Sequence, residues 1–546
     1  MPALARASAF ARAGLAAGLA ACALVPGAAV ADGPYVTGEA DLHLRFTSWR
    51  QRPDSDILYD PSRYTFALEG YLVPSVDETY PSALVSAALE GRALDGDLRW
   101  RFGAGSGEAR RKAFPSLQDV CLQNGGTGLG PPSVPGCLAP GLHRIVSLET
   151  TVPADPILTL GGRPAATEAQ DTWLIREAWA SLAFGRAGFA RLTAGRRRIT
   201  VADGLVHDDT SAGIEAAFDL GAIGPPFEVA AGLLVPSRDW PTAGATGSPM
   251  LVARAAWLPS LFESVGVFAA AMQDRSGGVA EMLRGQNEER AAVRLARAQA
   301  DPSGADEVVA AGLLASTLAA HYESDASLLW LGTSGALSPL PGQRLTWTAA
   351  ALVGTIDSVD VPRGTLLRDV AVHGGAARVR WDVELPRGFS AGGAFLWLTG
   401  GTLPEATVSN GELVAATGTY RGFLGVAPLV PHANLFFGGG LSETFSTLRT
   451  TAPGVNGRGV LSPAASLSWY PSEAFGLDTR LAWLRADVTG PYGGKVYGTE
   501  LDLSASFTPV PWLSVGLEWD VLWPGDFYGG QSTVTKKVIA VDVLTP

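Results

Sequence analysis

The residues from 377 to 385 divide into a charged face and an apolar face when they are read as an extended chain. One face is ionic throughout, with Arg378, Arg380, Asp382 and Glu384. The other is apolar throughout, with Ala377, Val379, Trp381, Val383 and Leu385. Successive side chains of a β-strand point to opposite faces, so this segment is predicted to be a strand with water on one side and an apolar environment on the other.

The same alternation returns along the chain. It is clearest at 41–46, 97–102, 344–349, 500–507 and 513–521, and the last two segments flank Thr508-Pro509-Val510-Pro511, which predicts a hairpin. Further strands are expected near 62–73, 80–91, 172–184, 188–199, 211–219, 226–236, 249–258, 264–273, 326–335, 389–399, 416–427, 431–445, 458–470, 475–488 and 534–544. With an ambiguous segment at 307–322 the total is about 18 to 22 strands, and we favour about 18 because bacterial barrels have an even number.

The first 31 residues have the layout of an export signal. Arg6 and Arg12 precede an apolar stretch rich in Ala, Leu and Val, and Ala29-Val30-Ala31 resembles a cleavage site before Asp32. A second interpretation stays open, in which Cys22 of Leu19-Ala20-Ala21-Cys22 is the acylated first residue of a lipoprotein. Because no later run of about 18 apolar residues exists, a chain embedded in a bilayer has to cross it as a closed sheet.

We therefore predict an all-β fold, a transmembrane antiparallel β-barrel of about 18 strands with a range of about 16 to 22. Residues 32–546 are expected to form it as a single domain. Insertions interrupt the strands at 104–170 and at 275–306, and the second contains a charged helical stretch. Either could fold into the channel as a constriction. Cys121 and Cys137 lie in the first insertion and are expected to form a disulfide, since exported chains meet oxidising conditions.

Charge and motifs argue against several classes of function. The net charge of −12 argues against nucleic acid as a partner, because phosphate binding needs a basic surface. His207-Asp208-Asp209 could suggest a metal or a base with its orienting carboxylate, but neighbouring side chains of an extended segment point apart. Neither a His-x-x-x-His pair nor a nucleophile elbow stands out. We expect no enzymatic activity, no catalytic residue, no metal site and no cofactor.

Segments in two parts of the chain resemble those of a known family. Leu174-Ile175-Arg176-Glu177-Ala178-Trp179, followed by Leu192-Thr193-Ala194-Gly195-Arg196-Arg197-Arg198-Ile199, is similar to the L-R-E-x-W … G-R-Q-R hairpin of the alginate-export porins. The stretches 498–503 and 519–528 resemble that family's G-x-E-[VI]-D-L … F-x-P-G-D-x-Y ending. The resemblance implies an outer-membrane barrel whose arginine-rich lumen passes an anionic polysaccharide outward. The chain departs from the family in its long inserted loops, and from bacterial barrels generally in lacking an aromatic last residue.

Polar faces of the predicted strands supply the candidate solute path. Carboxylates that leave bulk water for a narrow lumen need fixed positive charge, and arginine can hold them in two-point contacts at any relevant pH. The candidates are Arg45, Arg99, Arg101, Arg191, Arg197, Arg344, Arg378, Arg380 and Arg480, with Asp382, Glu384, Glu500 and Asp502 on the same faces. Any large porin also uses such charges for solvation and wall stability, and that structural interpretation stays open for each residue.

We expect a passive channel in the outer membrane of a Gram-negative bacterium. It would pass an anionic polysaccharide or small anionic solutes, and its partners would be outer-membrane lipid, the barrel assembly machinery and possibly periplasmic export proteins. Two alternatives remain: a plugged structural or adhesive barrel without transport, and a secreted β-rich lipoprotein.

Overall fold

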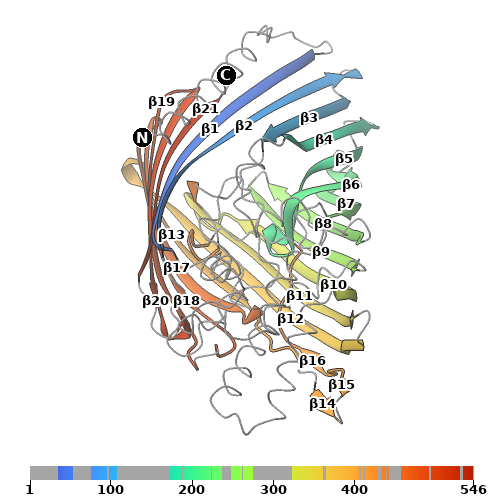
Figure 1. Ribbon diagram of the computed structural model, residues 1–546. Coiled ribbons are helices and arrows are strands. Elements are labelled where there is room, and N and C mark those ends of the chain that lie inside the picture. The colour runs from blue at the N-terminus through green and yellow to red at the C-terminus, as the bar shows by residue number, and fades with distance from the viewer. Residues whose placement is uncertain are drawn as a thin grey trace.

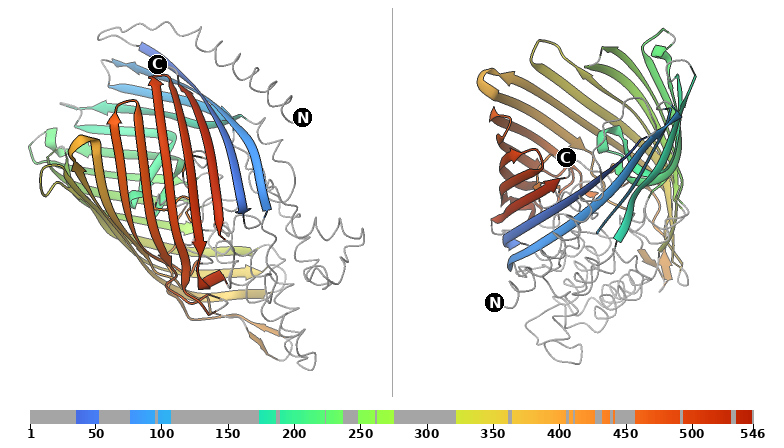
Figure 2. Two further views of the ribbon diagram at one scale, coloured as in Figure 1. Left: turned by 90° about the vertical axis from the view of Figure 1, so that its left-hand side faces the viewer. Right: turned by 90° about the horizontal axis from the view of Figure 1, so that it is seen from above.

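The segments with alternating polar and apolar side chains form strands, and the backbone N–H and C=O groups on both edges of each strand need hydrogen-bond partners. In this protein the strands supply these partners to one another by closing into a ring. The computed structural model describes residues 35–52, 76–94, 97–106, 173–185, 189–222, 224–236, 248–260, 262–274, 322–360, 364–404, 407–409, 412–426, 432–437, 440–441, 457–490, 493–528 and 533–544. Within these residues, 18 strands form one antiparallel barrel, and the last strand pairs with the first. Figures 1 and 2 show the strands surrounding a single interior.

The first half of the wall contains β1 (Tyr35–Arg52), β2 (Val76–Ala93), β3 (Leu98–Ser106), β4 (Trp173–Phe184), β5 (Ala190–Val201), β6 (His207–Asp219), β7 (Phe227–Val235), β8 (Met250–Ser260) and β9 (Glu263–Asp274). The second half contains β10 (Tyr322–Leu337), β11 (Gln343–Asp360), β12 (Gly364–Leu385), β13 (Phe389–Leu398), β17 (Val460–Ser472), β18 (Phe475–Arg485), β19 (Val496–Val510), β20 (Leu513–Pro524) and β21 (Val534–Leu544). Short helical turns follow some strands: η5 (Ala202–Gly204), η6 (Leu220–Ala222), η8 (Pro386–Gly388) and η11 (Asp526–Tyr528). No described helix is long and apolar enough to cross a bilayer.

The outer face of the barrel is an exposed apolar belt. Its aliphatic side chains include Leu192, Ile214, Leu233, Leu251, Val267, Leu331, Val353, Leu481, Leu517 and Ile539. Exposed aromatic side chains lie toward the two ends of the strands, with Phe184, Phe218, Phe227 and Trp257 toward one end and Trp397, Trp483 and Trp523 toward the other. A closed sheet with a lipid-facing apolar band between aromatic girdles is the architecture of proteins that span the Gram-negative outer membrane. The barrel is located in that membrane.

The two ends of the barrel differ in their connections. At one end consecutive strands are joined by short turns, such as Pro511–Trp512 between β19 and β20, and the described chain also begins and ends there. At the other end most connections are longer, although those between β5 and β6 and between β11 and β12 are also short. Outer-membrane barrels keep short turns on the periplasmic side and long loops outside the cell. We call these ends the short-turn end and the long-loop end.

Most predicted strands agree with the structure, and the segments 416–427 and 431–445 are corrections. Residues 412–426 hold only the short strands β15 (Glu412–Val414) and β16 (Thr419–Tyr420), and the described residues of 432–441 contain no strand. Thr407–Ser409 forms β14, which pairs with β15 beyond the long-loop end (Figure 1). The predicted strand at 62–73, the export signal, Cys22, and Cys121 with Cys137 lie outside the described residues. Most of the insertions 104–170 and 275–306 does too.

The closing strand is β21, although it lacks a terminal aromatic residue. It pairs with β20 from Leu513 to Leu522 and with β1 from Asp41 to Arg50. Figure 2 (left) shows the blue first strand beside the red C-terminal strands. Predicting 534–544 as a strand was therefore correct, and the barrel closes at the end of the chain.

Candidate functional site

A segment between β13 and β17 folds into the barrel, and we call residues 399–441 the lumen segment. Its first part completes the wall: β16 pairs in parallel with β12 at Ala371 and Val372, where β12 extends beyond its partner β13. The chain then turns inward, where Phe423, Leu424 and Val426 are fully buried. This part of the chain therefore narrows the interior of the barrel, although the alternation pattern had predicted it to form strands of the wall.

The inward part of the lumen segment packs against the inner face of the opposite strands. The Trp330 indole on β10 donates a hydrogen bond to the Leu424 carbonyl at 2.8 Å. The Val426 amide donates to the Val206 carbonyl, and His207 Nδ1 lies 2.6 Å from the Val426 carbonyl oxygen. His207 and Asp208 are thus parts of packed strands, and among the described residues no group of three or more His, Cys, Asp or Glu is arranged to hold a metal ion.

Carboxylates of β19 and β20 hold the far part of the lumen segment by its backbone, and we call Glu500, Asp502, Glu518 and Asp520 the carboxylate latch. Glu500 is fully buried and accepts the amide of Leu435 at 2.5 Å and that of Phe436 at 2.9 Å. The remaining bonds run from the Leu441 amide to Glu518 at 2.5 Å, from the Asn434 amide to Asp502 at 3.2 Å and from the Asn434 side chain to Asp520 at 3.2 Å. Gly440 has a φ of 80°, and a Cβ there would collide with the Glu518 carboxylate, so glycine permits the close approach.

A buried lysine neutralises part of the carboxylate latch. Lys536 of β21 has no exposed surface, and its ammonium lies 2.9 Å from Glu518 and 3.0 Å from Asp520. Beside it, Arg45 donates from Nε to the Leu441 carbonyl at 2.7 Å and forms an ion pair with Asp542, which also contacts His43 at 2.7 Å. The lumen segment is therefore attached to β19, β20, β21 and β1 as well as to β10 and the β5–β6 turn, and it crosses the barrel.

His432 is a titratable group of the lumen segment that lies within electrostatic range of arginines of the wall. Its Nε2 lies 2.9 Å from the Ser462 hydroxyl on β17, and the ring is buried. Burial, together with the positive charges of Arg480 and Arg378, lowers the pKa of His432 to about 4. His432 is therefore neutral at physiological pH while the lumen segment is docked.

Acidification is expected to weaken the docking of the lumen segment. A released His432 titrates near its ordinary pKa of 6.5 while the docked one titrates near 4, so the released state binds more protons between these values. Docking should lose up to about 3 kcal/mol as the pH falls from 7 to 4. The measurement is the rate of proteolysis within 427–441 at stepped pH. His432→Gln should remove this part of the pH dependence, and an identical profile in both proteins would contradict it.

Arg378 on β12 and Arg480 on β18 are the half-buried members of the predicted set that form no ion pair within 4 Å with any described side chain. Both are half-buried, and each lies within electrostatic range of the other and of His432. Asp203 of η5 faces Arg378, and Asp502 faces Arg480. Between them, the inner face of β13 and β17 carries small side chains at Gly392, Ala394, Ala464 and Ser466, while the buried Leu396 stands directly opposite Arg378.

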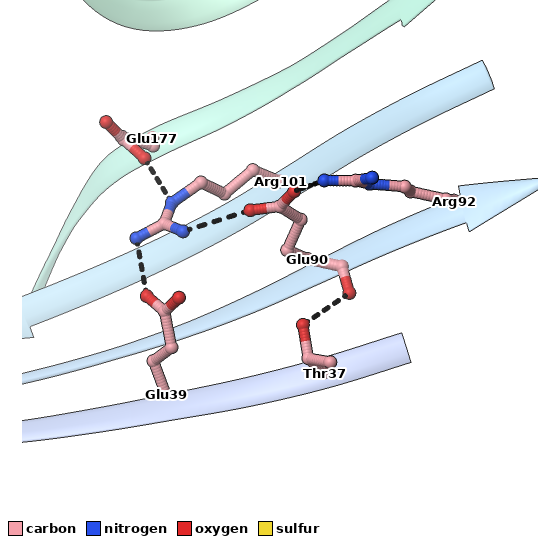
Figure 3. A network of polar contacts seen from close by, with 6 residues as sticks. All are labelled: Thr37, Glu39, Glu90, Arg92, Arg101 and Glu177. Carbon is pink, nitrogen blue, oxygen red and sulfur yellow. Dashed lines mark hydrogen bonds and ion pairs between the residues drawn. The ribbon is translucent and has the colours of Figure 1, made fainter. Parts of the chain in front are cut away.

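Four of the other predicted arginines, namely Arg45, Arg101, Arg197 and Arg380, are compensated by acids. Arg101 contacts Glu177 at 2.6 Å, Glu39 at 2.9 Å and Glu90 at 3.4 Å, as Figure 3 shows, with Arg92 beside Glu90. Glu177 thus faces the same inner side as Arg101. Two further predicted arginines form ion pairs on the inner face: Arg197 with Glu215 at 2.9 Å and Arg380 with Asp382 at 2.7 Å.

The remaining candidates lie near the short-turn end. Arg99, Arg191, Arg344 and Glu384 are exposed and stand within two residues of a strand terminus at that end. The structure therefore separates the predicted set into a group at this mouth, paired residues along the wall, and the Arg378–Arg480 pair. Glu500 and Asp502 lie on the inner face as the alternation predicts, but the lumen segment covers them.

Sequence reasoning missed the lumen segment with its His432, and it missed the roles of the latch residues Glu518 and Asp520 and of their buried partner Lys536. A usable signal was present: 328–331 reads Leu-Leu-Trp-Leu and 395–398 reads Phe-Leu-Trp-Leu, so these strands are apolar on both faces. A strand that is apolar on both faces needs a packed partner on its inner side. Pro431 and the run Gly438-Gly439-Gly440 also argue against a regular strand in 431–445.

Comparisons with known proteins find similar solved structures and no sequence relatives. No protein-family model and no curated protein matches the chain. Solved structures similar to it include OpdL from Pseudomonas aeruginosa, with a TM-score of 0.46 and 10% identity over 93% of this chain and 98% of that one. The outer membrane protein OpdK from the same organism has a TM-score of 0.42 and 10% identity over the same shares. A BenF-like porin from Pseudomonas fluorescens Pf-5 has a TM-score of 0.44 and 9% identity, again over 93% and 98%.

Proposed function

We propose that the protein is an outer-membrane channel that passes anionic solutes by diffusion, with Arg378 and Arg480 as the charges that favour anions. The observation that carries the proposal is the lack of compensation at this pair. Arg45, Arg101, Arg197 and Arg380 each contact a carboxylate within 4 Å, whereas Arg378 and Arg480 have no such contact with a described side chain. Two guanidinium groups within range of each other repel, and an anion between them relieves that repulsion.

The surroundings of the pair suit an anion in transit. Small side chains on β13 and β17 leave room between the two arginines, and the neutral His432 adds no competing charge. Ser466 offers a hydroxyl, and Asp382 lies over Gly392 at the edge of this region. Asp203 and Asp502 lie farther from the guanidinium groups than an ion pair, so they moderate the positive potential without neutralising it.

The lumen segment favours small anions over a thick polymer as the solute. It crosses the barrel from β10 to β19 and β20, which narrows the free section at this level. Monocarboxylates and short uronate oligomers meet the same guanidinium chemistry as an anionic polysaccharide and need less width. A broader form of this proposal includes the export of an anionic polysaccharide, with periplasmic export proteins as partners.

Neutralising the pair is expected to shift the ion selectivity of the channel toward cations. The reversal potential of the Arg378→Gln/Arg480→Gln variant in a salt gradient across a planar bilayer should move in that direction, because the fixed charge that attracts anions is lost. The charge-conserving Arg378→Lys/Arg480→Lys variant should keep most of the anion preference. Arg198→Gln, which removes a cation from the outer face, serves as the matched control, and an equal shift in that control would overturn the assignment.

A plugged barrel without transport is the second candidate, and the dense packing of the lumen segment favours it. Tyr420, Phe423, Leu424 and Leu435 are fully buried within the barrel. A plugged barrel should show no steady open current in the same bilayer experiment. A steady current that uronate oligomers block in the wild type, and block less in Arg378→Gln/Arg480→Gln, would decide for the channel.

A further inference from the structure

The outer face carries two cations at the seam where the barrel closes, Arg50 on β1 and Lys537 on β21. Lys536 points into the barrel and is fully buried, so Lys537 points outward, and it is exposed. Arg50 is also exposed and lies on the same face as the exposed Phe46. Lys537 pairs with Ser48 in the register of β1 and β21, so Arg50 is its diagonal neighbour. The backbones of such diagonal neighbours are about 7–8 Å apart, within reach of two long side chains.

The level of this pair along the barrel is marked by tryptophans. Lys537 stands directly opposite Trp519 of β20, which is 46% exposed, and Trp523 of the same strand is 44% exposed. Tryptophan collects at the boundary between hydrocarbon and headgroups. The cations therefore lie where the lipid headgroups of the leaflet at the long-loop end meet the protein.

The pair differs from another outward-facing cation of the described wall. Arg198 on β5 is held by two bonds of 2.7 Å to Asp208, so its charge is compensated by the protein. Neither Arg50 nor Lys537 forms an ion pair with a described acidic side chain. Exposed cations at the edge of a membrane, with their stems along apolar surface, are placed to meet anionic headgroups.

We infer that Arg50 and Lys537 form a binding site for a phosphate-bearing lipid of the leaflet at the long-loop end. The guanidinium of Arg50 can hold two oxygens of a headgroup phosphate, and the ammonium of Lys537 adds a point charge beside it. The rings of Trp519 and Trp523 would pack along the first part of the acyl chains. Since the site spans the contact of β1 with β21, the bound lipid also bridges the two strands that close the barrel.

The test is lipid retention by the folded full-length protein in detergent micelles. Native mass spectrometry would follow titration with bisphosphorylated lipid A, with dephosphorylated lipid A and with inorganic phosphate. The Arg50→Gln/Lys537→Gln variant should bind bisphosphorylated lipid A at least about tenfold more weakly than the wild type, because two charge-assisted contacts are lost. Arg50→Lys/Lys537→Arg should keep most of the binding. Arg387→Gln, at the short-turn end, should match the wild type.

Three results would overturn the inference: equal retention by the wild type and Arg50→Gln/Lys537→Gln, equal retention of the dephosphorylated lipid, or displacement of the lipid by inorganic phosphate at matched concentration. The last result would mean that the cations take free phosphate and not a lipid. A lower unfolding midpoint of Arg50→Gln/Lys537→Gln in lipid A micelles, with no change in phosphate-free detergent, would support the bridging of β1 and β21.

Discussion

Replacing Lys536 with methionine is expected to destabilise the barrel by about 3–5 kcal/mol. The lysine is fully buried between Glu518 and Asp520, whose side chains are 1% and 0% exposed. Methionine fills a similar volume, so the loss comes from two carboxylates that keep their burial without their cation. The measurement is urea unfolding of the folded protein in micelles of a phosphate-free detergent, where no headgroup phosphate can occupy Lys537, and the folded fraction is read from the altered gel mobility that folded barrels keep until they are heated.

A matched control exists one residue away. Lys537→Met makes the same chemical change on the outer face, where the side chain is exposed, and it should change the unfolding free energy by less than about 1 kcal/mol. Lys536→Met combined with Glu518→Gln and Asp520→Asn should recover part of the loss, because the buried charges are removed with their partner. Equal effects of Lys536→Met and Lys537→Met would show that burial of the ion pair does not matter.

Replacing Glu500 with alanine is expected to release the lumen segment from β19. Glu500 accepts the backbone amides of Leu435 and Phe436, and all three residues are buried. Removing the acceptor leaves two buried donors without partners, which should weaken docking by about 2–4 kcal/mol. We expect faster proteolysis within 427–441 and, in planar bilayers, larger and noisier single-channel currents.

Two variants separate release of the lumen segment from a general loss of charge. Glu500→Gln keeps one carbonyl acceptor in place and should have a smaller effect than Glu500→Ala. Glu473→Ala removes a carboxylate from the exposed turn between β17 and β18 and should leave proteolysis and current as in the wild type. Unchanged currents in Glu500→Ala, together with faster proteolysis, would mean that the segment does not limit the path.

Local pattern was enough to predict most of the wall. Segments such as 500–507 and 513–521 present ionic or small residues on one face and mostly large apolar residues on the other, and the structure has them within β19 and β20. A period of two reports only which side chains share a face, and in a closed sheet that is the information needed to predict strands. The even strand count then followed from the expectation that bacterial barrels have an even number of strands.

The candidate site was predicted less well, for a physical reason. Tyr420, Phe423 and Phe436 read like lipid-facing residues of a strand, yet they pack inside the barrel. An apolar side chain loses contact with water in either place, so local hydrophobicity does not tell lipid from a filled lumen. Local polarity is equally ambiguous for Glu500 and Arg480, which both lie on polar inner faces. The lumen segment covers Glu500 and leaves Arg480 half-buried.

The sequence by itself determined that this protein is a β-barrel with an apolar exterior, since alternating side chains leave no other way to satisfy the backbone in a membrane. It also predicted which arginines lie on the polar faces of the strands. Only the tertiary structure decided which of them form ion pairs, because Arg101 contacts Glu39, Glu90 and Glu177, whereas Arg378 has Asp203 only at longer range. The course of the lumen segment was decided at the same level, by carboxylates and a lysine that meet only when β19, β20 and β21 lie side by side.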